Sequence, residues 1–250
     1  MKFTNSDKFE NLIQFVREVK ELPRVTIDLQ YCFAKKNCDF FRDYVKDFHK
    51  QTQRQHSKFK IVKAMSLGVA LKELENSWDD YFMSIDGSAR RNCKKALREG
   101  FTVGQISFND WLQDIHEIVT SAEERQGRPM PKSLLDEGVR PNRNPPTLDP
   151  RHDYVFYGVE KDGRLVAYAG CFICGEVCMI ESIYGHSSFQ TSGVVPLLIT
   201  EIAKDIISTR ETVKYYVYGT TYGARKSMQR FKQKFRFNPA RVHWKLGEKE

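Results

Sequence analysis

Residues 154–184 read YVFYGVEKDGRLVAYAGCFICGEVCMIESIY, and their pattern decides the fold. β-Branched and aromatic residues fill three segments, which two short turn sequences separate. The first turn, Asp162-Gly163, favours a two-residue hairpin because both residue types tolerate a positive φ. The second turn is Gly175-Glu176. The pattern predicts three consecutive antiparallel strands, at 154–160, 164–174 and 178–184.

Helices and strands alternate after these three strands. An apolar run at 194–207 predicts a buried helix, and residues 213–218 predict a strand. A second helix is expected at 224–235, followed by a closing strand at 240–246. The predicted order is therefore three strands, helix, strand, helix, strand.

Helices and one strand are also predicted ahead of residue 154. A short helix is expected at 77–83, and Ser88 is a suitable N-cap for a second helix that ends at Gly100. A strand at 101–106 and an amphipathic helix at 110–126 follow. The apolar stripe of the second helix is expected to consist of Ala89, Cys93, Ala96 and Leu97.

Residues 127–153 contain six prolines, which remove backbone donors and interrupt regular hydrogen-bond ladders. We therefore expect a loop here, with one helical turn near 133–136. A loop of this length is usually functional or disordered.

The first 73 residues predict a helix, a strand, a helix and a strand. They carry no motif that indicates a function. The four segments are expected at 7–22, 25–33, 39–53 and 59–65.

Composition indicates an ordinary globular protein with an excess of positive charge. The 250 residues are 40% hydrophobic and 29% charged, with a formal net charge of +8. No run of about 18 apolar residues occurs, so we expect no membrane span. The first residues lack the apolar run of a signal peptide, which predicts a cytoplasmic protein. The charge favours phosphorylated partners such as a coenzyme, a nucleotide sugar or RNA, although many basic enzymes bind no nucleic acid.

Four parts of the chain carry a family signal through their order and spacing. They are SARRNCKKA at 88–96 with the strand after it, GRLVA at 163–167, the strand, loop and helix at 181–202, and YYVYG at 215–219 followed by FKQKFRF at 231–237. Together they resemble the GNAT superfamily and, within it, the FemAB-like acyltransferases.

The resemblance covers residues 74–246 and implies both a fold and an activity. The fold would be α/β (α+β), a GNAT-like mixed, mostly antiparallel sheet flanked by helices, with an N-terminal helix-strand extension. Residues 74–250 would form the acyltransferase domain. Residues 1–73 would be a degenerate GNAT half or a cap.

In GNAT enzymes the loop after the fourth strand holds the donor's pyrophosphate, because free N–H groups and the positive end of a helix dipole meet an anion there. The resemblance places this site in the loop 190–195. Val195 stands where the family has a small residue, which weakens the match to an acetyl-CoA site. A capped core helix is the structural alternative. The residues implied in donor binding are Gln190, Thr191, Ser192, Gly193 and Val194.

The resemblance also implies three catalytic residues. Lys232 belongs to the family's Phe-Lys pair, and its ammonium would stabilise the oxyanion formed when an amine attacks a carbonyl. Glu181 lies where many GNAT enzymes keep a carboxylate base for the attacking amine. Tyr222, like Tyr184 and Tyr218, is expected near the cleft and would donate a proton to the leaving group. The alternatives are a solvated lysine, a carboxylate paired with an arginine, and tyrosines that serve only in packing.

Two basic clusters are compatible with phosphate or RNA contact, because arginine binds phosphate bidentately and lysine acts as a point charge. The alternative is two solvated helix faces. The clusters are represented by Arg90, Arg91 and Lys94, and by Arg225 and Arg230.

The cysteines at 171, 174 and 178 do not predict a metal site. Cys171 and Cys174 lie three residues apart in one expected strand, so their side chains point to opposite faces. We therefore predict no bound metal and assign these cysteines to the core.

Three hypotheses for function follow. In the first, the protein moves an acyl group from an acyl-CoA or carrier thioester to an amine of a small molecule or sugar, with the loop 127–153 shaping the acceptor site. In the second, an aminoacyl-tRNA ester is the donor. In the third, the chain is a non-catalytic RNA-binding or scaffold module. No tightly bound cofactor is expected, and the oligomeric state stays open.

Overall fold

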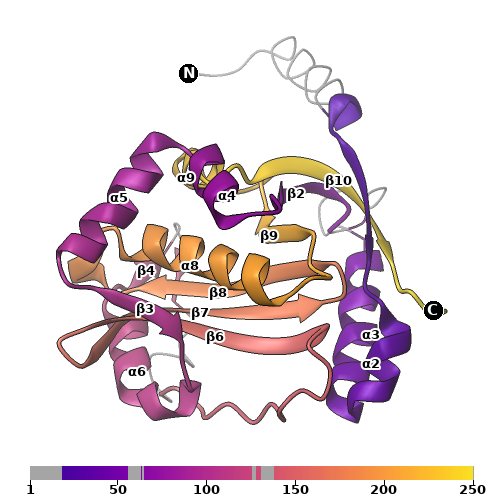
Figure 1. Ribbon diagram of the computed structural model, residues 1–250, viewed down its shortest axis with the longest axis horizontal. Coiled ribbons are helices and arrows are strands. Elements are labelled where there is room, and N and C mark those ends of the chain that lie inside the picture. Colours follow the sequence, from indigo (N-terminus) through magenta and orange to yellow (C-terminus); the bar gives the residue numbers. More distant parts are fainter. Residues whose placement is uncertain (1–18, 56–62, 64, 126–127, 131–137, 250) are drawn as a thin grey trace.

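In the part of the chain that the structure describes, eight strands form one mixed sheet in the order β1-β10-β2-β9-β8-β7-β6-β3 (Figure 1). The computed structural model describes residues 19–55, 63, 65–125, 128–130 and 138–249. The mostly antiparallel sheet flanked by helices is the fold that the sequence predicts.

The three predicted strands are present at the centre of the sheet. They are β6 (His152–Lys161), β7 (Arg164–Cys174) and β8 (Val177–Gly185), each within a few residues of the expected bounds. The turn between β6 and β7 has φ values of 52° at Asp162 and 75° at Gly163, which confirms the predicted two-residue hairpin.

The outer strands come from distant parts of the chain. On one side of β8 lie β9 (Tyr215–Thr220), β2 (Leu67–Glu73), β10 (Asn238–Lys245) and β1 (Arg24–Asp28), and on the other side of β6 lies β3 (Thr102–Gln105). Two of the seven pairings are parallel, β1 with β10 and β8 with β9.

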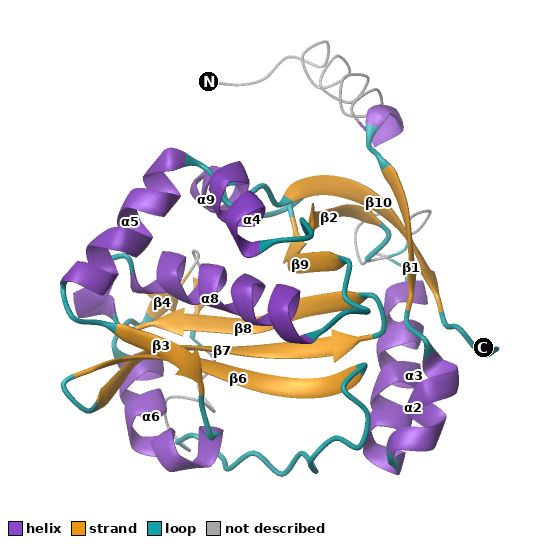
Figure 2. Cartoon of the chain, viewed as in Figure 1, coloured by secondary structure: helices purple, strands orange, loops and turns teal. Residues whose placement is uncertain are grey.

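The long helix α8 (Val194–Thr209) lies across one face of the sheet (Figure 2). Its apolar residues pack with Cys171, Ile180 and Tyr216, and we call this side the α8 face. The helices α4 (Trp78–Ser84), α5 (Gly87–Arg98) and α9 (Lys226–Lys234) contribute to the same core.

The opposite side of the sheet, the α3–α6 face, is covered by helices at its two ends. At one end α3 (Asp39–Gln53) packs on Phe172 and Val217, and α2 (Tyr31–Asn37) lies beside α3. At the other end α6 (Leu112–Thr120) packs on Leu165 and Tyr168. The other elements in the described ranges are short: η1 (Phe108–Trp111), β4 (Glu124–Arg125), β5 (Arg128–Pro129) and η2 (Ser187–Phe189).

Several predicted boundaries are wrong for identifiable reasons. The strand expected at 25–33 ends at Asp28, because the Asp28 side chain accepts the Gln30 N–H at 2.8 Å and Gln30 turns the chain at φ 51°. The helix expected at 110–126 ends at Thr120, where the Ser121 hydroxyl donates back to the Ile118 carbonyl. The second upstream helix is capped by Asp86 rather than by the expected Ser88.

Other expectations have mixed outcomes. Strand β2 was not predicted, and Leu97, expected inside, is 55% exposed. The expected helix at 7–22 and strand at 59–65 lie largely outside the described residues, and the helical turn at 133–136 lies wholly outside them. The division at residues 73 and 74 stays a prediction; β1 and β2 pair with β10 within the same sheet as the later strands.

None of the helices in the described part of the chain has the length and apolar character that crossing a membrane requires.

One buried histidine joins the start of β6 to the segment after β1. His152 has no solvent exposure, and its Nε2 lies 2.8 Å from the Leu29 carbonyl oxygen. The Asn37 side chain donates to the His152 carbonyl oxygen at 3.2 Å. His152 Nδ1 is buried and has no hydrogen-bond partner among the described residues.

We expect this histidine to make the free energy of unfolding depend on pH. Burial lowers the pKa of His152 below its ordinary value, so the unfolded chain binds the proton more readily. This stability is present above the unfolded pKa of roughly 6.5 and is lost as the pH falls through the folded pKa. Urea unfolding between pH 5 and pH 7 measures it, and H152Q, which keeps a donor for Leu29 without titrating, should show a flatter profile. An unchanged profile would contradict this role.

Candidate active site

The parallel strands β8 and β9 separate partway along their length. Their pairing consists of three residue pairs, from Val177 with Tyr215 to Met179 with Val217. Directly beyond this point each strand carries a β-bulge. The register of β8 against β7 shifts at Glu181, and that of β9 against β2 shifts next to Gly219, which has a φ of 58°. Because bulges bend the strands that carry them, the two strands open into a splay.

Lys232 lies at the open end of β9, on the α8 face. Its side chain is only 6% exposed, and its Nζ donates to the Thr220 carbonyl oxygen at 2.9 Å. The same nitrogen lies 4.7 Å from the centre of the Tyr218 ring. Burial lowers the pKa of Lys232 to about 8, although the carbonyl oxygen and the ring face both favour the cation.

The predicted alternative of a solvated lysine is therefore wrong for Lys232. A buried ammonium that can lose its proton near neutral pH is a feature typical of functional sites. Its catalytic role is still a prediction.

Glu181 lies on the other strand of the splay and on the opposite face of the sheet. Its carboxylate is exposed, and one oxygen accepts a hydrogen bond from the Tyr44 hydroxyl at 2.8 Å. Burial and then the neighbouring Glu181 raise the pKa values of Tyr44 and Tyr154, so both hydroxyls stay protonated beside this carboxylate. Tyr44, rather than an arginine, holds the Glu181 carboxylate in place. The sequence gives no signal for the pair with Tyr44, because the two residues are 137 positions apart.

Two of the three candidate tyrosines, Tyr218 and Tyr222, lie in different surroundings. Tyr218 is buried beside Lys232, and burial followed by the nearby Tyr184 raises its pKa. Tyr222 is half-buried and covers the α carbon of Gly68, where a side chain would collide with the ring. These contacts indicate a packing role for Tyr222, and its catalytic role is still a prediction.

The amino end of α8 is covered by α5. Gly193 begins the helix at φ 81° and is buried, and any side chain there would collide with the backbone carbonyl of Asn92. Lys95 Nζ donates to the Thr191 carbonyl oxygen at 2.9 Å. Pro196, in the first turn, has no N–H to offer. Few free donors therefore face an anion at this helix end.

The contact between α5 and the start of α8 buries some residues of the expected donor loop and leaves others exposed. Gln190 and Thr191 are exposed, Ser192 is half-buried, and Gly193 and Val194 are buried.

Exposed cations are present on α5 and α9. On α5, Arg91 and Lys94 are exposed, whereas Arg90 is half-buried and contacts the Met83 sulfur. On the α9 side, Arg230 is exposed and Arg225 forms an ion pair with Glu124 at 3.1 Å. The two helices meet where the Asp86 N–H donates to the Lys234 carbonyl oxygen at 2.8 Å.

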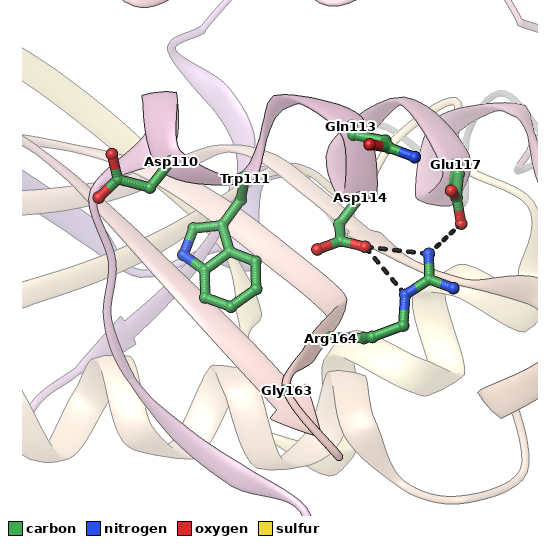
Figure 3. A pocket seen from close by; sticks show the side chains of 7 residues that line it. All are labelled: Asp110, Trp111, Gln113, Asp114, Glu117, Gly163 and Arg164. Carbon is green, nitrogen blue, oxygen red and sulfur yellow. Dashed lines mark hydrogen bonds and ion pairs between the residues drawn. The ribbon is translucent and has the colours of Figure 1, made fainter.

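Two surface hollows lie away from the splay, at the turn between β6 and β7. One, of about 340 Å³, is bounded by Trp111 and by Arg164, which pairs with Asp114 at 3.0 Å and also with Glu117 (Figure 3). The other, of about 490 Å³, adjoins it at Glu117 and Arg164 and extends to His186. Neither hollow is lined by Lys232 or Glu181.

The cysteines at 171, 174 and 178 are buried, as their assignment to the core predicts. Cys171 packs on the α8 face and Cys174 on the α3–α6 face, so they do not share a ligand. Across the described ranges, no three His, Cys, Asp or Glu side chains gather closely enough to hold a metal ion.

Comparison with known proteins gives a family match and likenesses to solved structures. Residues 87–233, more than half of the chain, match the family model described as an acetyltransferase (GNAT) domain. The solved structure of FemX is similar at a TM-score of 0.54 and 11% identity over 69% of this chain. L-PGS from Bacillus licheniformis gives a TM-score of 0.43 at 11% identity over 69% of this chain. This chain spans 59% of FemX and 58% of L-PGS. No curated protein sequence matches it.

The family match lies over the splayed strands, α8 and the Lys232 helix, and the likeness to FemX extends over the same fold. The chain therefore belongs to the GNAT acetyltransferase domain family.

Proposed function

We propose that the protein transfers an aminoacyl group from the ester of an aminoacyl-tRNA to an amine. The observation that carries this proposal is the covered amino end of α8, where Gly193 abuts the backbone of Asn92. A CoA donor needs its pyrophosphate at such a helix end. An RNA donor brings its phosphates to an exposed basic surface instead.

The splay is the proposed place of the donor's carbonyl carbon. The acceptor amine attacks this carbon, and the carbonyl oxygen gains negative charge beside the Lys232 ammonium. Glu181 takes a proton from the attacking nitrogen, directly or through water. When the tetrahedral intermediate collapses, the new C–N bond remains and the ester C–O bond breaks. The ribose oxygen leaves as a hydroxyl with the proton that Glu181 took from the nitrogen, returned through water.

Lys232 and Glu181 lie on opposite faces of the sheet, which suits their separate roles as oxyanion stabiliser and base. A planar ester held between the separated strands presents its oxygen to one face and its open side to the other. Donor and acceptor then approach from opposite faces of the sheet, which is the geometry that a direct transfer without a covalent enzyme intermediate needs.

The RNA backbone is proposed to lie along α5 and α9. Arg91, Lys94 and Arg230 are exposed and carry the charge that phosphate contacts require. Arg225 would exchange its partner Glu124 for a phosphate, since an exposed ion pair of this kind contributes only ~0–1 kcal/mol.

An acyl-CoA donor is the alternative, and the description of the matching family model favours it. It requires α5 to move away from Gly193. The two donors are therefore distinguishable by binding.

Replacing Lys232 tests the oxyanion role. We expect K232M to slow aminolysis of a mixed aminoacyl-tRNA pool by hydroxylamine about 10²- to 10³-fold, because the cation at the carbonyl oxygen is lost. The exposed α8 residue Lys204 provides the control variant K204M, which should keep the wild-type rate. Circular dichroism checks that both variants fold.

The pH profile of the same reaction gives a second readout. Because the pKa of Lys232 is about 8, the wild-type rate should fall as the pH rises through this value and the ammonium is lost. A rate that rises above pH 8 would make Lys232 a base and contradict the oxyanion role.

Donor binding tests the choice of donor. We expect deacylated tRNA to bind at low salt and to be released at high salt, and R91A/K94A to bind it more weakly with a smaller salt slope. The exposed α3 residue Lys50 gives the control K50A, with unchanged binding. Thermal stabilisation by millimolar CoA, together with tRNA binding that R91A/K94A leaves intact, would assign the donor to CoA instead.

A further inference from the structure

The tyrosine that contacts the proposed base Glu181 comes from a part of the chain that the family match does not include. Tyr44 lies on α3, whereas the match begins at residue 87. The Tyr44 hydroxyl donates to Glu181 Oε2 at 2.8 Å, across 137 positions of sequence. This hydrogen bond therefore links the N-terminal part of the chain to the splay of β8 and β9.

Helix α3 is a rigid support for this tyrosine. Its residues Phe41, Val45 and Phe48 are buried in the core of the α3–α6 face. The Phe48 ring meets the Trp244 ring of β10 at 5.4 Å and the Phe172 ring of β7 at 5.7 Å, both edge to face. Because protein interiors are close-packed, contacts with two separate strands fix the helix on the sheet.

The Tyr44 ring is itself held by its neighbours. The Phe172 ring lies edge to face at 4.5 Å, the Phe40 ring is stacked at 5.6 Å, and the Tyr154 ring lies at 6.3 Å. Aromatic pairs at such distances favour defined orientations, so the direction of the hydroxyl is set. Burial, followed by the nearby Glu181, raises the pKa of Tyr44, and the hydroxyl therefore stays a donor.

Glu181 needs a support of this kind because it is exposed and lies in a bulge of β8. An exposed glutamate has several staggered rotamers, and only some of them direct its carboxylate at a given point. A base acts efficiently only when it is held in the right geometry for the reacting group. One hydrogen bond from a fixed donor selects among these rotamers.

A neutral donor suits a base better than a cation does. Among the residues that the structure describes, no arginine or lysine forms an ion pair with Glu181, and the hydroxyls beside it belong to Tyr44 and Tyr154. A cation would strongly favour the charged form of a carboxylate and make it a weaker base. A hydroxyl orients the carboxylate with a smaller loss of basicity, because hydrogen bonds from neutral donors are weaker.

We infer that Tyr44 is a positioning residue for Glu181, which makes α3 a functional part of the active site. The Tyr44 hydroxyl holds the carboxylate in the rotamer that faces the amine in the splay. A carboxylate offers about four acceptor positions, so one bond to Tyr44 leaves room for the amine. The inference rests on the proposed function, in which Glu181 is the base. It makes transfer depend on a residue that the family match does not contain.

A double-mutant cycle on kcat tests this inference in the full chain. Y44F keeps the ring and removes the hydroxyl. It should lower kcat of the hydroxylamine reaction about tenfold, because the carboxylate loses its hydrogen bond. The KM for aminoacyl-tRNA should stay unchanged, since a misplaced base slows the chemical step and not donor binding. E181Q should lower kcat about 10²-fold. The double variant Y44F/E181Q should be no slower than E181Q, since Tyr44 acts only through the carboxylate.

Tyr215 provides the matched control. It is a half-buried tyrosine packed on the same core, and its acidic neighbours are Glu73 and Glu176 rather than Glu181. Y215F should therefore keep the wild-type kcat. Circular dichroism checks that each variant folds. If Y44F does not fold, Y44M, which keeps an apolar side chain and also lacks the hydroxyl, takes its place in the cycle.

The outcomes separate this inference from the proposed function. A wild-type kcat in Y44F beside a slow E181Q would refute the inference alone, and so would additive losses in the double variant. A wild-type kcat in E181Q would refute the base role itself. The same proteins assayed with acetyl-CoA and hydroxylamine give the same comparison for a thioester donor, so the choice of donor does not decide the result.

Discussion

The pair of β-bulges in β8 and β9 is the constraint on which the site depends. A parallel pair that stayed in register would close the sheet and leave no room for a substrate between the strands. Here the extra residue at Glu181 and the left-handed Gly219 stop the pairing after Met179 and Val217. The same two irregularities position the chemistry, because Glu181 is itself the extra residue of one bulge and Lys232 Nζ bonds the Thr220 carbonyl directly after the other.

The sequence predicts the centre of this fold well and its edges less well. The hairpin of β6 and β7 and the helix α8 follow from strict local signals, an Asp-Gly turn and a long apolar run. Strand β2 reads LGVALKE, whose leucine, alanine, lysine and glutamate favour helix; only the strands on both sides of it, β9 and β10, impose the extended form. Local preference cannot reveal a strand that its neighbours determine.

The candidate site is even harder to predict from local sequence than the edges of the sheet. Lys232 was identified through a motif, and its burial could not be read from a helix with many lysines. A glycine can begin a helix whether the preceding loop is open to solvent or covered. Gly193 is covered by the backbone of Asn92, and the side-chain types in the sequence do not reveal a backbone contact. The hydrogen bond from Tyr44 to Glu181 likewise joins residues that are far apart in sequence, so no sequence pattern predicts it. Tertiary contacts thus decide which residues of a sequence motif can perform the function that the motif indicates.

The position of β10 has a consequence for how the chain folds. This strand, the last in sequence, lies between β1 and β2, the first two. During synthesis both early strands lack their shared partner until residues 238–245 have emerged, and contacts this distant in sequence form slowly. Nascent chains therefore carry unpaired strand edges for much of translation, so yield in recombinant expression should depend on chaperone supply and on the rate of synthesis.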